Sequence, residues 1–480
     1  MSRTAPAAPD KGEAQHGVRL ARFAADARRR TLPPEVSLKT KIHIIDSLAA
    51  IVSGAALEAG IAGQRYAAAF GQREQASIVG TDLRAPLVEA ALANGMAAHA
   101  DESDDSHEES QTHPGCGVLP AALAVAEMEG SSGLDFLHAV HLGYEMTIRF
   151  GEALAPAMSF ARSSLSCHAY GPLFGAGFAA GSLMGFDAEK FQILLNYLAQ
   201  EASGLTTWRL DGAHTLKSYV FAGMPASNGV KAAALVRSGF TGSGDVLDPA
   251  DRNFFDAISA ETKPELLFRE LGTRHKILET DIKNYPVGFP IAAPLAALEE
   301  IMARTGVKSG DVEAVRIFYH PDWYKVIGDE NRMPDLNLRH CMAATAVEGA
   351  LTFTASHDVD RMQDPAIVAF GRRISFLDAE PDQDRFEARV ELVVGGAVHR
   401  AAQGRHVLGR KENPMSTRQV HDKAVELMST VVTREAALHA IAVVETIEQA
   451  PNINALIATL NPANRSAEVA PQLDAVSPRM

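Results

Sequence analysis

A short stretch of this sequence combines residue types that transfer protons at neutral pH. Residues 99–113, HADESDDSHEESQTH, contain three histidines, six acidic residues and the hydroxyl of Ser106. A carboxyl group crowded by other acids has a raised pKa, and a histidine titrates near neutral pH. We therefore predict that Asp101 and His113 act as acid and base in one reaction.

Two other interpretations apply to the same stretch. Metal binding is not expected, because the sequence has no HExxH motif, no paired CxxC and no loop of regularly spaced oxygen ligands with a glycine turn. The composition alone also fits an exposed acidic loop without chemistry.

Helices are predicted on both sides of the stretch. Pro86 and the apolar residues after it predict a helix that ends near His99. Pro120 in a first turn and Gly130 after the last residue predict a second helix. The polar groups would then lie on a loop that two packed helices hold in place, a common position for catalytic residues.

Helical patterns continue to about residue 240 and return from residue 420 to 460. Pro34 opens a helix that ends at Gly54, and Asp187 caps another. The Gly- and Ala-rich residues 171–186 fit a tightly packed helix better than a membrane span. Ser416 and Gln419 form a predicted capping box.

A different pattern lies between these helical parts. Residues 312–320, VEAVRIFYH, and 386–399, FEARVELVVGGAVH, alternate apolar and polar side chains, and Gly395-Gly396 predicts a hairpin turn. The predicted fold is mainly α, with a large all-helical domain formed by residues 17–270 and 406–464 and a smaller inserted α+β domain of residues 271–405. Residues 1–16 are predicted to be a disordered N-terminus, and residues 465–480 a loose tail.

Composition narrows the classes of function. The 480 residues are 46% hydrophobic and 22% charged, which is usual for a globular enzyme, and the net charge is −14. Nucleic acid is not an expected partner, because phosphate binding needs a basic face. Three widely spaced cysteines and the absence of an apolar signal core predict a cytoplasmic protein without a membrane segment.

The sequence also resembles a known family. Residues 94–127, NGMAAHADESDDSH…HPGCGVLPAALAVAE, look like the signature of the MmgE/PrpD family. Further similar segments follow in the family's order: LPPEVSLKTKIHIIDSLAAIVSG, FGAGFAAGSLMGFD, GMPASNGVKAAALVRSGFTG, DIKNYPVGFPIAAPLAAL and ENPMSTRQVHDK. The resemblance implies a helical domain with a smaller α+β lid, a homodimer, and cofactor-free chemistry on a small di- or tricarboxylate.

The resemblance also implies site residues. Asp101 and His113 match the acidic and imidazole positions of the family, and Lys217 and Lys283 match two lysines that would bind a carboxylate. Ser106 stands where a threonine is usual.

Two histidines and one lysine depart from the family pattern. His168 lies two residues after the position of the family's histidine, and His340 stands where many members have a tyrosine. Both are candidate catalytic residues. Lys217 is one residue further from Gly223 than the pattern has it.

The resulting functional prediction is a lyase. We expect a dehydratase of a 2-methylcitrate-like hydroxy acid, in which a base removes the proton alpha to a carboxylate while an acid protonates the departing hydroxyl. An epimerase or a decarboxylase of a related polycarboxylate would use the same residues. A non-catalytic binding protein on the same fold is the alternative from another class.

Overall fold

The computed structural model describes residues 15–70, 73–158, 163–242, 244–248 and 253–460. Helices dominate, and the few strands form one two-stranded and one four-stranded sheet. The predicted class, mainly α with a small β-containing part, is confirmed.

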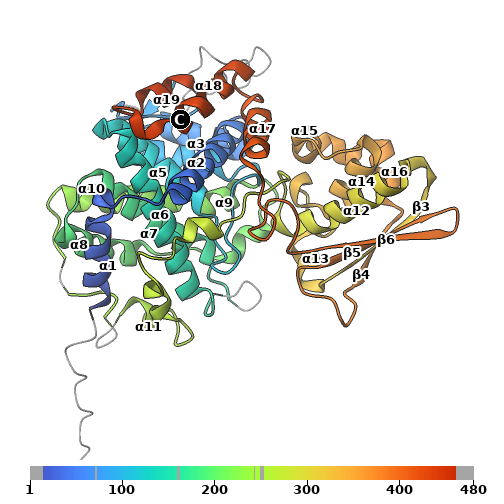
Figure 1. Cartoon of the computed structure of the whole chain (residues 1–480), viewed down its shortest axis with the longest axis horizontal. Coiled ribbons are helices and arrows are strands. Elements are labelled where there is room, and N and C mark those ends of the chain that lie inside the picture. The colour runs from blue at the N-terminus through green and yellow to red at the C-terminus, as the bar shows by residue number, and fades with distance from the viewer. Residues whose placement is uncertain (1–14, 71–72, 159–162, 243, 249–252, 461–480) are drawn as a thin grey trace, which may run out of the picture.

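The larger part of the molecule is a set of packed helices from both ends of the described chain (Figure 1). The helices before residue 260 are α1 (His16–Ala25), α2 (Pro34–Gly54), α3 (Glu58–Ala68), α4 (Leu87–Ala98), α5 (Pro114–Glu129), α6 (Gly133–Leu154), α7 (Cys167–Leu183), α8 (Ala188–Glu201), α9 (Thr215–Ser218), α10 (Met224–Arg237) and α11 (Phe254–Ile258). The C-terminal helices are α17 (Thr417–Met428), α18 (Arg434–Glu445) and α19 (Asn454–Thr459). A short hairpin pairs β1 (Ala76–Ser77) with β2 (Arg84–Ala85).

Small residues let the central helices approach closely. A side-chain carbon at Gly175 of α7 would lie 1.9 Å from Oγ1 of Thr147 on α6, and one at Gly229 of α10 would lie 2.6 Å from the backbone of α7. These contacts explain why residues 171–186 are rich in Gly and Ala: the segment is the buried α7 and the turn after it, as predicted.

The second part contains the four-stranded sheet and its helices. The strand order is β4 (Ile374–Asp378), β3 (Val312–Tyr319), β5 (Ala388–Val394) and β6 (Ala397–Gln403), with β3 parallel to β4 and the other pairs antiparallel. The helices of this part are α12 (Ala292–Thr305), α13 (Pro321–Ile327), α14 (Leu338–Glu348), α15 (Phe353–His357) and α16 (Pro365–Gly371). Gly395 and Gly396 have φ of +56° and +78°, the left-handed values that a two-residue hairpin requires, so the predicted hairpin is confirmed.

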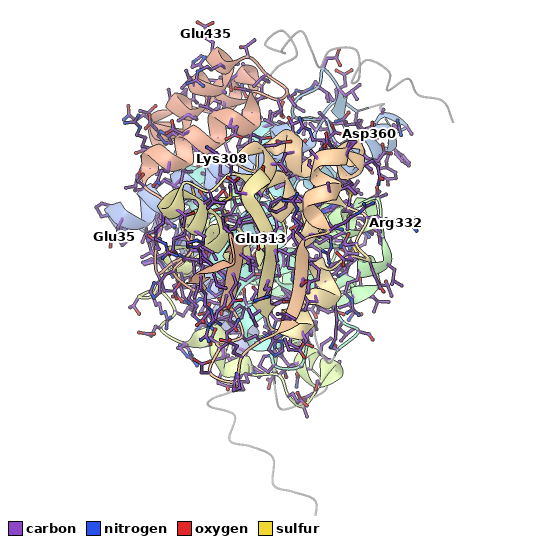
Figure 2. The ribbon with its side chains drawn as sticks, turned by 90° about the vertical axis from the view of Figure 1, so that its right-hand side faces the viewer. Glu35, Lys308, Glu313, Arg332, Asp360 and Glu435 are labelled. Carbon is purple, nitrogen blue, oxygen red and sulfur yellow. The ribbon has the colours of Figure 1, made fainter. Side chains whose placement is uncertain are left out.

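Each part has its own hydrophobic core. One core draws buried residues from Leu20 to Ile277 and again from Ala424 to Leu460, and the other draws them from Tyr285 to Val407. Figure 2 looks onto the part that carries the sheet, where Lys308, Glu313 and Asp360 lie on the outer surface. The exact domain boundaries, 271 and 405, stay a proposal.

Local signals predict most helix ends. The Asp187 side chain accepts from the backbone of Lys190, and Ser416 and Gln419 form the expected capping box. One prediction was wrong: α5 begins at Pro114, and Pro120 lies inside it. The predicted tail of residues 465–480 lies outside the described residues. The predicted tail of residues 1–16 lies outside them except for its last two residues, of which His16 is the first residue of α1.

Within the described ranges, no single helix is both long enough and apolar enough to cross a membrane. The pair α2 and α3 meets both criteria only when the two helices are taken together, and they are bent by 81° relative to each other.

Candidate active site

The acidic stretch between α4 and α5 is buried, so the interpretation as an exposed loop was wrong. Asp101, Asp104 and Asp105 have no exposed surface, and Glu102 is 2% exposed. Buried carboxylates are costly unless positive or hydrogen-bonding groups surround them. The structure supplies such partners for each one.

Asp105 and the backbone of Ser103 fix the loop to four helices. The carboxylate of Asp105 accepts hydrogen bonds from the backbone of Gly115 (2.8 Å) on α5 and from the hydroxyl of Tyr144 (2.5 Å) on α6, and Nδ1 of His43 on α2 lies 2.7 Å from it. Lys423 of α17 donates to the carbonyl of Ser103 (2.8 Å). The loop is therefore a rigid support for the side chains between these anchors.

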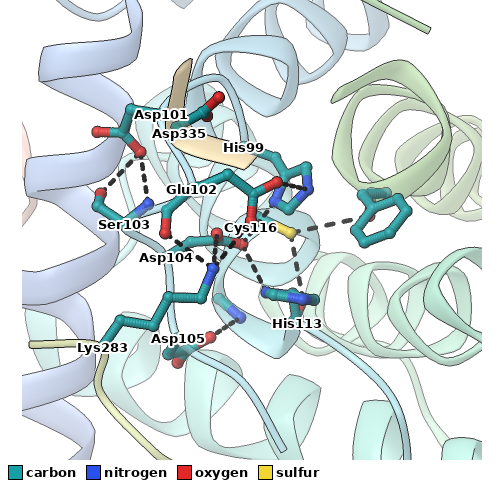
Figure 3. Close-up of polar contacts among 12 residues, drawn as sticks. His99, Asp101, Glu102, Ser103, Asp104, Asp105, His113, Cys116, Lys283 and Asp335 are labelled. Carbon is teal, nitrogen blue, oxygen red and sulfur yellow. Dashed lines mark hydrogen bonds and ion pairs between the residues drawn. The ribbon is translucent and has the colours of Figure 1, made fainter. Parts of the chain in front are cut away.

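Asp101 points away from the pocket described below. Its carboxylate accepts from the hydroxyl of Ser53 (2.5 Å) and from the hydroxyl (2.7 Å) and backbone (2.9 Å) of Ser103, and Figure 3 shows it turned away from Lys283. We expected Asp101 to face the site, and this expectation is corrected: successive side chains of the loop point in different directions, and that of Asp101 points away from the pocket.

Glu102 takes the position that we predicted for Asp101. Oε1 lies 3.0 Å from Nε2 of His214 and in contact with the ammonium group of Lys217, and Oε2 lies 3.1 Å from Nζ of Lys283. Both Glu102 and His214 have left-handed backbones, with φ of +54° and +61°. Such conformations are unfavourable for residues other than glycine and often mark functional sites.

Asp104 lies between two imidazoles. Its Oδ2 is 2.9 Å from Nδ1 of His99 and 3.2 Å from Nδ1 of His113. Burial raises the pKa of this carboxyl group, but His99, His113 and Lys283 lower it more, so the pKa lies well below its usual range. The ionised Asp104 therefore lies within ion-pair distance of both imidazoles.

One pocket of about 370 Å³ opens beside these groups, and both parts of the molecule form its walls. The helical part contributes Glu102, Ser106, His113, His168, Trp208, Lys217 and Phe221. The part with the sheet contributes Phe289, Pro290, Trp323, Val326, Leu336 and Phe386.

Four of the predicted site residues line this pocket: His113, His168, Lys217 and Ser106. The Oγ of Ser106 is buried and has no hydrogen-bond partner among the residues that the structure describes. Lys283 reaches Glu102 from behind the lining and donates to the Glu102 carbonyl as well (2.8 Å).

His340 does not line the pocket. It is buried on α14, and its Nε2 lies 2.9 Å from the carbonyl of Ala355. The expectation that it faces the site is corrected, because the contact with Ala355 holds the ring inside the second part of the molecule.

His168 lies at the first turn of α7 and stacks on Phe221, with ring centroids 4.3 Å apart. Phe221 belongs to a π-helical turn, Tyr219–Gly223, which widens the helix between α9 and α10. Such turns are frequent at functional sites. Burial lowers the pKa of His168 well below its usual range, and the nearby His113 lowers it further. A neutral imidazole at this position can accept a proton.

Some of these groups could also hold a metal ion. The ligand atoms of His99, Asp104 and His113 lie within 4.8 Å of one another, as do those of His99, Glu102 and His214. These are ligand types that divalent cations bind. The short contacts between each histidine and carboxylate already account for the arrangement, and the expectation of no metal stays a prediction.

Sequence reasoning missed Glu102, Asp104, His99 and His214. Glu102 is next to the predicted Asp101, so the acidic motif gave the right place with an offset of one residue. His214 had no local signal, because its contact with Glu102 spans 112 positions of sequence.

Residues 18–267 match the MmgE/PrpD N-terminal domain, and residues 285–449 match the MmgE/PrpD C-terminal domain. The chain belongs to the MmgE/PrpD family. The family resemblance of the acidic and proline-containing motifs is thereby confirmed.

The chain is similar in sequence to several cis-aconitate decarboxylases and related proteins. A cis-aconitate decarboxylase-like protein of Aspergillus oryzae is 25% identical over 298 residues, which cover 59% of this chain and 60% of the relative. The cis-aconitate decarboxylase of Aspergillus terreus is 25% identical over 59% of the chain and 60% of the relative. The human cis-aconitate decarboxylase is 28% identical over 49% of this chain and 48% of the relative. The matches thus span less than two thirds of these relatives.

Proposed function

We propose that this protein is a lyase that acts on a small polycarboxylate by proton transfer at the pocket beside His113 and His168. The observation that carries the proposal is the placement of two imidazoles and Lys217 in one pocket wall, with Asp104 and Glu102 directly behind them. This arrangement provides a base, an acid and a cation, which chemistry next to a carboxylate requires.

The two imidazoles have different environments. His113 lies 3.2 Å from the carboxylate of Asp104, whereas burial lowers the pKa of His168 and favours its neutral form. An imidazole beside a carboxylate and a buried neutral imidazole in one pocket are suited to act as acid and base in one turnover. We assign His113 as the proton donor and His168 as the acceptor.

Decarboxylation is the reaction that we favour. Loss of carbon dioxide leaves an electron pair on carbon, and protonated His113 returns one proton to that carbon while Lys217 balances the charge of the remaining carboxylates. The names of the relatives support this reaction over the dehydration expected from the sequence.

Dehydration is the second candidate, and the pairing of His168 with His113 supports it. The neutral imidazole would remove the proton alpha to a carboxylate, and the protonated one would give its proton to the departing hydroxyl. An epimerase would need the same pair on opposite faces of one carbon.

One experiment separates these reactions. Purified protein is incubated with cis-aconitate, citrate and methylcitrate, and the ultraviolet absorbance of the conjugated double bond is recorded together with released carbon dioxide. Consumption of cis-aconitate with release of carbon dioxide is the expected result. A rising absorbance with a hydroxy acid and no carbon dioxide would identify a dehydratase instead.

Exchange of substrate protons in heavy water completes the test. Exchange without a change in absorbance would point to an epimerase. If neither these acids nor their longer-chain alkyl analogues turn over or exchange, the catalytic proposal is wrong, and binding of such an acid without turnover would support the alternative of a non-catalytic binding protein.

A homodimer is proposed on the family resemblance, and light scattering of the purified chain tests it.

A further inference from the structure

The pocket is larger than a small polycarboxylate needs. Pockets of about 300–1,000 Å³ hold drug-sized ligands, and this pocket, with about 370 Å³, falls in that range. cis-Aconitate is smaller than such ligands. An acid of that size at His113 and Lys217 leaves the far side of the pocket unfilled.

That far side is mostly apolar. The part of the molecule that carries the sheet lines it with Phe289, Pro290, Trp323, Val326, Leu336 and Phe386, and Arg385 of the same part also belongs to the lining. Several are only half-buried although they are large and hydrophobic. Apolar surface that stays exposed inside a pocket gains free energy when a ligand covers it.

The apolar wall has a fixed shape. The ring centroids of Phe386 lie 6.4 Å from Phe289 and 5.6 Å from Trp323. A side-chain carbon at Gly288 would lie 2.3 Å from Leu336, so the glycine permits the close packing of this wall. A preformed wall costs little ordering on binding.

The charges around the pocket favour a neutral group there. Glu102 balances one of the two lysines at the acid-binding end. Elsewhere in the lining, Glu108 and Glu109 of the acidic loop pair with Arg405 and Lys411, so these cations are already balanced. Arg385 packs against Trp323, 5.0 Å from the ring, and lies 3.7 Å from Asp322.

We propose that the wall of Phe289, Trp323, Val326, Leu336 and Phe386 is a hydrocarbon subsite, and that the substrate is a polycarboxylate carrying an alkyl chain. The acid groups bind at Lys217 beside His113 and His168, and the chain lies against the aromatic wall. The inference rests on the proposed function for the acid end, and it names the substrate class of the same pocket.

Binding of unreactive analogues tests the subsite separately from catalysis. Calorimetry measures the affinity of the full-length protein for succinate, butylsuccinate, pentylsuccinate and (4-carboxybutyl)succinate. Each buried methylene is expected to tighten binding about fourfold, so pentylsuccinate should bind at least a hundredfold more tightly than succinate. The (4-carboxybutyl)succinate, which ends in a carboxylate, should bind more weakly than pentylsuccinate.

A matched pair of variants locates the subsite. Val326→Phe fills the subsite and should remove most of the gain in affinity from the alkyl chain, so that pentylsuccinate binds this variant only slightly more tightly than succinate does. Val359→Phe makes the same change at a position that is 61% exposed and outside the pocket lining, and it should bind like the wild type.

The outcomes are distinguishable. Equal affinity for succinate and pentylsuccinate, or tighter binding of (4-carboxybutyl)succinate, would overturn the hydrocarbon subsite, and Arg385 would then be the candidate for a further anion site. An affinity that rises with the length of the alkyl chain, and a rise that Val326→Phe abolishes, would support the hydrocarbon subsite. This result would hold even if no acid turns over and the proposed reaction is wrong.

Discussion

Nδ1 of His113 lies 3.2 Å from Oδ2 of Asp104, a carboxylate with no exposed surface. This contact directs the opposite nitrogen of the imidazole away from Asp104. Asp104→Asn keeps the shape but removes the charge, so we expect kcat to fall about a hundredfold or more with a smaller change in KM. Steady-state kinetics over a range of pH measure the change in kcat and KM, and circular dichroism controls for folding. Wild-type kcat at every pH would show that Asp104 does not act through His113.

The two neighbouring acids Asp101 and Glu102 should differ in their effect on catalysis. Glu102→Gln removes the counter-ion of Lys217 and Lys283, and kcat/KM is expected to fall about a hundredfold. Asp101→Asn alters only contacts with Ser53 and Ser103, so kcat of the folded protein should stay within about threefold, with about 1–2 kcal/mol less stability. A larger loss of kcat in Asp101→Asn than in Glu102→Gln would show that Asp101, and not Glu102, acts at the site.

Lys217 should act mainly in binding. Lys217→Met removes the cation that lines the pocket, and KM for a carboxylate substrate is expected to rise about tenfold or more. Lys231→Met is the control, because Lys231 is half-exposed and pairs with Glu201 outside the pocket lining. The two variants should differ in KM by that factor, and equal KM values would remove Lys217 from substrate binding.

Buried His141 should make the protein less stable in acid. Burial, followed by the nearby His275 and His138, lowers the pKa of His141 to about 3, below the value of about 6.5 in an unfolded chain. The unfolded state therefore binds more protons between these values, and stability falls as pH falls from 6.5 toward 3. The loss from this residue at pH 5 is about 2 kcal/mol.

Urea unfolding at several pH values measures this effect. His141→Gln should show a slope of unfolding free energy against pH that is lower by about one proton. An unchanged slope would mean that His141 is charged in the folded protein.

Gly115 should tolerate no side chain. An added carbon would lie 2.1 Å from Oγ of Ser47 and 2.7 Å from the hydroxyl of Tyr144, and it would strain the contacts that anchor the loop. Gly115→Ala is expected to cost about 1–3 kcal/mol. Gly310→Ala, where nothing lies within 4 Å, should change the unfolding free energy by less than about 0.5 kcal/mol in the same urea titration. Similar values for both variants would contradict this account of the loop.

Local patterns predicted the elements better than the site. Alternation and the paired glycines gave β5 and β6, and proline and capping residues gave α2, α8 and α17. These signals lie within a few residues of the element that they specify, so the sequence alone carries them.

The site depends on distant contacts that no short pattern contains. The family resemblance located Lys217 and Ser106, and the acidic and histidine-rich motif located His113. Neither distinguished Asp101 from Glu102, because the left-handed backbone of Glu102 decides which carboxylate enters the pocket. The position of His340 follows from its contact with Ala355, which the sequence does not mark.

The bonds of Lys423 have a consequence for biosynthesis. This residue of α17 donates to the Ser103 carbonyl across 320 positions of sequence and to the carboxylate of Asp46 across 377. A nascent chain that has not yet reached α17 already contains every residue of the pocket wall, but its Asp46 lacks the ion pair with Lys423, and an unpaired buried carboxylate is costly. Activity should therefore arise only after synthesis of the C-terminal helices, and not while the ribosome is still extending the chain toward them.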